Sequence, residues 1–68
     1  MTLEITITTV EDLDYNGAPV TVKQLTATLD GESAAMIHSE DGAVADATAK
    51  TNFRAKLTAK GYTWDDEI

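Results

Sequence analysis

The longest stretch of the chain without a strong helix breaker, residues 43–60, constrains the fold most. It is rich in alanine, lysine and arginine, which favour helix formation. Ala49, Phe53 and Leu57 recur every four residues, so a helix would place them on one face. Gly61 follows at the position where a glycine commonly ends a helix. The sequence therefore predicts a helix whose apolar stripe needs another layer to cover it.

The first residues of the chain predict a β-strand. Residues 2–10 alternate between apolar and polar, with Leu3, Ile5 and Ile7 on one face. A half-buried strand with one solvated face has this pattern. Asn16-Gly17 then favours a turn, because both residues tolerate positive φ angles.

Two more strands are expected over residues 20–29 and 32–39, joined by the two-residue turn Asp30-Gly31. A hairpin centred on this turn pairs Leu25 with Met36 and gathers apolar residues on one face. Val20 and Val22 lie on the opposite parity, which favours a bulge or a twist near Lys23-Gln24. A short helix over residues 32–39 is the alternative.

These elements predict one α+β domain over residues 1–68. We expect an antiparallel three-stranded sheet in the order β-β-β-α, with one helix packed on one face. Tyr62-Thr63-Trp64 could add a short final strand or pack on the end of the helix. A chain of 68 residues has a small core, so a partner or self-association could contribute to its stability.

The net charge of −7, from twelve acids and five bases, excludes several classes of partner. Binding of nucleic acid requires Lys and Arg to neutralise phosphates, and anionic membranes attract basic segments. Four of the five bases lie within residues 47–61, so the expected sheet and loops are strongly acidic. We therefore expect a basic protein partner and no direct contact with nucleic acid or membrane. The other interpretation is that the acidity only keeps the protein soluble.

No arrangement of residues predicts catalysis, a cofactor or a metal centre. The chain lacks cysteine and has one histidine, His38, which rules out the usual zinc ligand sets. Residues 12–17 match the first half of an EF-hand loop, but Lys23 occupies the twelfth position, where calcium needs a glutamate. The serines lack the sequence context of a nucleophile. We expect a protein that is not an enzyme and, without a secretory leader, a cytoplasmic location.

In size, charge and lack of catalytic groups, the chain resembles the short acidic inhibitors encoded by phages and mobile elements, including anti-CRISPR and anti-restriction proteins. The resemblance covers these general features only. It implies an inhibitor in the host-cell cytoplasm that mimics DNA and occupies the basic surface of a nucleic-acid-binding complex. The candidate residues of this acidic surface are Glu11, Asp12, Asp14, Asp30, Glu32, Glu40, Asp41, Asp65, Asp66 and Glu67.

Four large apolar residues are candidate hot spots of the interface, because such residues often dominate binding energy. They are Tyr15, Ile37, Tyr62 and Trp64. For Trp64, a place in the core across the end of the helix is slightly favoured over a place in the interface. The alternative function is that of a structural or assembly subunit, such as a phage component or a homodimer, whose threonine-rich strand face packs on another sheet.

Overall fold

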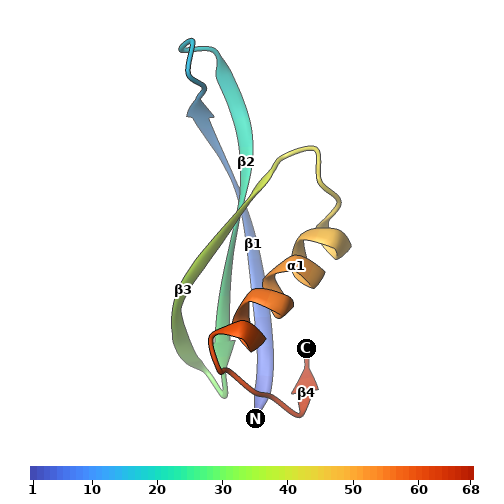
Figure 1. Cartoon of the computed structure of the whole chain (residues 1–68). Coiled ribbons are helices and arrows are strands. Elements are labelled where there is room, and N and C mark those ends of the chain that lie inside the picture. Colours follow the sequence, from blue (N-terminus) through green and yellow to red (C-terminus); the bar gives the residue numbers. More distant parts are fainter.

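A computed structural model describes the backbone of residues 1–68 and every side chain except that of Ala35. Its strands form one sheet in the order β3-β2-β1-β4, and the single helix packs against one face (Figure 1). The α+β class is therefore confirmed, with four strands in place of the expected three. The elements are β1 (Thr2–Leu13), β2 (Pro19–Leu29), β3 (Glu32–Asp41), α1 (Asp46–Ala59) and β4 (Asp66–Glu67).

β1 and β2 form a long antiparallel ribbon. Their register is continuous, from Leu3 opposite Leu29 to Leu13 opposite Pro19. The leading apolar residues of the expected alternation are buried beneath α1, so that prediction is confirmed. The bulge considered near Lys23-Gln24 is absent, because the pairing of β1 with β2 is continuous there. The first valines of β2 lie on the face of the sheet that α1 does not cover.

β3 is a strand, as expected, but its register differs from the prediction. Thr28 pairs with Ser33 and Thr26 pairs with Ile37, so three residues of β3 face a single residue of β2 between these pairs. The shift places His38, and not Met36, opposite Leu25. His38 therefore lies beneath the helix, which the sequence pattern did not predict.

The core is small and lies between α1 and one face of the sheet. The helix contributes Ala49, Phe53 and Leu57, none of which is exposed, so the predicted stripe is confirmed. The remaining buried residues come from the first three strands. They are Leu3, Ile5, Leu25, Ala27, Leu29 and Ala34.

The two ends of α1 differ in how they are capped. Its first turn begins three residues later than predicted, and Ala45 occupies the N-cap position without a side-chain hydrogen bond. At the other end Gly61 has a φ angle of +95° and donates to the Thr58 carbonyl at 3.0 Å. Tyr62 donates to the Leu57 carbonyl at 3.1 Å. These bonds form a Schellman motif, so the predicted role of Gly61 is confirmed.

The last residues return to the sheet. The final strand is Asp66–Glu67, and not the expected segment at Tyr62, and it pairs in parallel with Thr2 and Leu3 of β1. Tyr62 and Trp64 are half-buried and pack against the core on the way. The expected acidic tail is thus part of the fold.

The molecule is elongated, measuring 42 × 20 × 19 Å. Its far end is the β1–β2 ribbon, which continues past α1 and β3 (Figure 1). β3 pairs with β2 only as far as Val22, so residues 11–21 form a two-stranded projection. We call residues 11–21 the hairpin tip. Within the described part of the chain, no helix is long and apolar enough to span a bilayer.

Candidate acidic interface

The hairpin tip is closed by a turn that Asp14 organises. The Asp14 carboxylate accepts hydrogen bonds from the backbone N–H groups of Asn16 at 2.8 Å and Ala18 at 2.9 Å. The Asp14 N–H donates to the Ala18 carbonyl at 2.9 Å, and Gly17 adopts a φ angle of +82°. Asp14 is therefore a turn-forming residue as well as a surface charge.

Two large side chains of the hairpin tip are exposed to solvent. Tyr15 is fully exposed and Leu13 is 66% exposed. Val20, which pairs with Asp12 across the ribbon, is 36% exposed. An exposed tyrosine that follows Asp12, Leu13 and Asp14 in the sequence combines an aromatic contact with negative charge. Such a combination is suited to a protein interface.

The hairpin tip carries three acids, Glu11, Asp12 and Asp14, and no base. The nearest base in the ribbon is Lys23, whose ammonium group donates to Asp46 at 2.8 Å and to the Val44 carbonyl. The Lys23 ammonium group is thus paired at the start of α1, where it lowers the pKa of Asp46 below its ordinary value. The negative charge of the tip is left without a local counterion among the described residues.

A second group of predicted acids lies at the opposite end of the molecule, around the Met1 ammonium group. Asp65 binds this ammonium at 2.7 Å, and the contact lowers the pKa of the Asp65 carboxyl. Asp30 and Asp66 are close enough to raise the pKa of the ammonium further. Glu32 is exposed at the start of the neighbouring β3.

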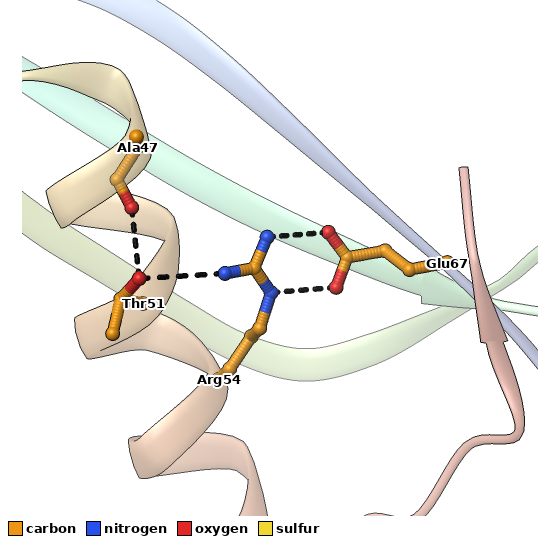
Figure 2. Close-up of polar contacts among 4 residues, drawn as sticks. All are labelled: Ala47, Thr51, Arg54 and Glu67. Carbon is orange, nitrogen blue, oxygen red and sulfur yellow. Dashed lines mark hydrogen bonds and ion pairs between the residues drawn. The ribbon is translucent and has the colours of Figure 1, made fainter.

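The other three predicted acids serve internal contacts. Glu67 forms two hydrogen bonds of 2.6 Å with Arg54 of the helix, which lower the pKa of the Glu67 carboxyl (Figure 2). Glu40 lies 2.7 Å from His38, accepts from Asn52 at 2.9 Å, and has a lowered pKa for these reasons. Asp41 accepts from the backbone N–H of Ala43. Seven of the ten predicted acids therefore form two separate groups at opposite ends of the molecule, and the other three lie in internal contacts, so the ten do not form one surface.

His38 lies in the edge strand β3 and is half-buried. Its ring stacks on Phe53 with centroids 5.5 Å apart and planes 9° from parallel. Nε2 faces Glu40, and Nδ1 is buried without a hydrogen-bond partner among the described atoms. No serine hydroxyl is paired with this ring in the described structure; Ser33 instead contacts the Ala34 carbonyl. The described residues contain no cluster of three or more His, Asp or Glu side chains that could hold a metal ion.

The candidate hot spots are dispersed. Tyr15 lies at the hairpin tip, whereas Ile37 is 62% exposed on the uncovered face of the sheet, beside Thr26. Tyr62 and Trp64 lie against the core at the opposite end from Tyr15. Of the four residues, Tyr15 alone lies within an acidic group that projects from the packed domain.

Sequence reasoning missed one feature, the outer edge of β1. β4 covers this edge only at Thr2 and Leu3. Beyond them, no other described strand pairs with it. The available signal was the uninterrupted β-branched run over residues 5–10, Ile-Thr-Ile-Thr-Thr-Val.

Comparisons of the chain with models of protein families, with curated protein sequences and with solved structures find no match.

Proposed function

We propose that this protein is a small acidic binding module that uses its hairpin tip to occupy a basic surface of a partner protein. The observation that carries the proposal is the composition of the tip. Glu11 and Asp12 lie beside the exposed Leu13 and Tyr15, and the tip contains no base. Carboxylates favour a basic partner, and the aromatic ring supplies a contact that charge alone cannot.

The form of the tip supports insertion into a groove. It is a narrow two-stranded projection at one end of a molecule 42 Å long, and its turn is held by the hydrogen bonds of Asp14. A preformed turn loses less conformational freedom on binding than a flexible loop does. The partner that fits this charge is a protein whose basic groove otherwise holds nucleic acid. Occupation of that groove would inhibit it, which is the mode of action that the resemblance to anti-CRISPR and anti-restriction proteins implies.

The test is a competition assay with a panel of purified basic nucleic-acid-binding proteins, nucleases included, each loaded with labelled DNA or RNA. The tip variant combines Glu11→Gln with Asp12→Asn, which leaves the turn-forming Asp14 in place. The control variant combines Glu32→Gln with Asp66→Asn and removes the same amount of charge from the opposite end.

We expect the wild-type protein and the control variant to displace nucleic acid from a member of the panel, and the tip variant to lose this ability. Displacement should also weaken as salt is raised, because exposed charges are screened. Displacement that both variants retain at high salt would refute the proposal. If only the control variant loses the ability to displace nucleic acid, the binding site lies at the opposite end of the molecule and not at the hairpin tip.

A second candidate function, assembly with other sheets, is favoured by the uncovered face of the sheet. Ile37 is 62% exposed there, close to the Thr6 and Thr26 pair. An oligomer whose contact is centred on Ile37 and these threonines would resist salt, since these side chains are uncharged. Light scattering of the wild-type protein and of Ile37→Asp tests it: a salt-resistant oligomer that the substitution disrupts would favour assembly over inhibition.

A further inference from the structure

We propose that the free outer edge of β1 receives an extended, basic segment of the partner as an additional strand of the sheet. This inference rests on the proposed function and gives the partner segment a conformation and a binding mode. The edge begins where β4 ends and runs toward the hairpin tip, so one partner could contact both.

The direction of the backbone groups along β1 follows from hydrogen bonds at its start. The carbonyl of Thr2 points toward β2 and accepts from the Asp30 N–H at 3.0 Å. The carbonyl of Leu3 points the other way and accepts from the Ile68 N–H at 2.9 Å. The backbone N–H and C=O groups of successive residues in a strand point alternately to its two sides. The register of β1 with β2 has no break, so this alternation continues along β1. The N–H and C=O groups of Ile7, Thr9 and Glu11 therefore point outward from the sheet.

The composition of this edge leaves it unprotected. The six residues from Ile5 to Val10 are all β-branched and include no charge, glycine or proline. Sheet proteins usually protect a free edge with a charged residue, a proline or a bulge, because unpaired backbone groups recruit other strands. β-branched residues also favour the extended conformation that an incoming strand requires.

The opposite edge of the sheet is protected in the usual ways. β3 carries Glu32 at its start and Glu40 and Asp41 at its end. Its register is also interrupted between the pairs made by Thr26 and Thr28. The contrast between the two edges identifies β1, and not β3, as the edge that is open to pairing.

Charge determines the kind of strand that fits. The uncharged run is flanked by Glu4 on one side and by Glu11 and Asp12 on the other. Opposite charges on adjacent strands attract and like charges repel, so Lys or Arg on the incoming strand would be favoured. A second copy of the chain would instead bring together two molecules that each carry a net charge of −7. The occupant is therefore a basic segment of another protein.

The test uses a ten-residue peptide of alternating lysine and threonine and follows amide hydrogen exchange by NMR. In the free protein, the amides of Ile7, Thr9 and Glu11 should exchange fast, because they have no partner strand. Peptide binding should slow their exchange. Thr6 and Thr8 should change little, since their N–H groups already face β2. An alternating pattern of protection is specific to strand addition.

Thr9→Pro with Thr9→Ala is the matched pair of variants. Proline removes the outward N–H of Thr9 but no hydrogen bond to β2, so an edge strand tolerates it. We expect Thr9→Pro to weaken peptide affinity by about tenfold or more and Thr9→Ala to leave it nearly unchanged. Unchanged amide protection in β2 would show that the fold of Thr9→Pro is intact.

The outcomes separate this inference from the proposed function. Salt-dependent peptide binding that is equal in the two variants, without protection of Ile7, Thr9 and Glu11, would refute strand addition. The acidic tip would then remain the binding surface. Absence of peptide binding would also refute strand addition, whereas the competition assay judges the tip independently. If the same three amides become protected with rising protein concentration alone, the occupant is a second copy, and the proposed basic partner strand is wrong.

Discussion

Arg54 and Glu67 join α1 to β4 through two parallel hydrogen bonds, from Nε to Oε1 and from Nη2 to Oε2, each 2.6 Å long (Figure 2). Thr51 supports the arrangement: its hydroxyl donates to the Ala47 carbonyl at 3.0 Å and accepts from Arg54 Nη1 at 3.5 Å. β4 has only two residues, so its own pairing with β1 is limited. The ion pair therefore contributes to holding the C-terminal segment on the sheet.

We expect Glu67→Gln to lower the free energy of unfolding by about 0.5–1 kcal/mol, because the pair is bidentate but partly exposed to solvent. Arg54→Lys should have a similar effect, since an ammonium group cannot donate two parallel hydrogen bonds in this geometry. Urea denaturation measures both. Asp66→Asn, one residue away on β4, is the control and should have little effect. A double-mutant cycle of Glu67→Gln with Arg54→Lys that gives no coupling energy would contradict this account.

The Glu67 carboxyl also affects how the free energy of unfolding depends on pH. Contacts within the fold lower the pKa values of Glu67 and Glu40 from an ordinary 4.5, and that of Asp46 from 3.8. A carboxyl with a lower pKa in the folded state stabilises the protein above its unfolded pKa. That stability is lost as the pH falls through the folded pKa. We therefore expect the free energy of unfolding to decrease below about pH 4.5.

Urea denaturation at a series of pH values between neutral and acidic measures this dependence. Glu67→Gln removes one of the carboxyls whose pKa is lowered in the fold, so its free energy of unfolding should vary less steeply with pH than that of the wild type. Equal slopes for the two proteins would mean that the Arg54 contact does not persist in solution.

Gly42 lies where the fold has no space for a side chain, and no sequence pattern indicates this. A Cβ atom at this position would lie 2.7 Å from the Thr21 carbonyl oxygen and 2.9 Å from the Thr21 Cβ. The Gly42 N–H also donates to that carbonyl at 2.9 Å. We expect Gly42→Ala to lower the free energy of unfolding by about 1–3 kcal/mol, because the closest atom belongs to the backbone and cannot rotate away.

Thermal or urea denaturation of Gly42→Ala, Thr21→Ala and the double variant tests this explanation. Thr21→Ala removes the contact with the Thr21 Cγ2 atom but keeps the Cβ atom and the carbonyl. We therefore expect Thr21→Ala alone to have little effect on the free energy of unfolding. The double variant should keep most of the loss of stability that Gly42→Ala causes. Full rescue in the double variant would show that the Thr21 side chain, and not its backbone, limits the space.

The parts of the fold that were predictable are those with a repeating pattern. The stripe of Ala49, Phe53 and Leu57 and the alternation in β1 both depend on local periodicity. Gly61 was predictable because a helix ending in the left-handed conformation strongly favours glycine. β4 was not predictable, since two residues contain no period and their position depends on a contact with Arg54, thirteen residues away from Glu67.

The position of His38 shows why the candidate site was harder to predict than the fold. Its place beneath α1 depends on a shift of two residues in the register of β3, which hairpin symmetry about Asp30-Gly31 does not anticipate. Glu40 lies two residues from His38 on the same face of β3, and it contacts both His38 and Asn52 of the helix, so an acid expected at the surface serves the fold. Composition indicated an acidic protein, but tertiary contacts decide which acids are free.

Tyr15 and Trp64 should separate binding from stability. Trp64 is half-buried against the core, so Trp64→Ala should lower the free energy of unfolding by about 1–3 kcal/mol. Tyr15 is fully exposed at the hairpin tip, so Tyr15→Ala should change stability by less than about 0.5 kcal/mol. Under the proposed function, however, Tyr15→Ala should weaken displacement of nucleic acid from the partner. Trp64→Phe, which keeps an apolar ring, should recover much of the stability. If folded Trp64→Phe loses displacement while Tyr15→Ala retains it, the interface lies at the C-terminal end of the molecule and not at the hairpin tip.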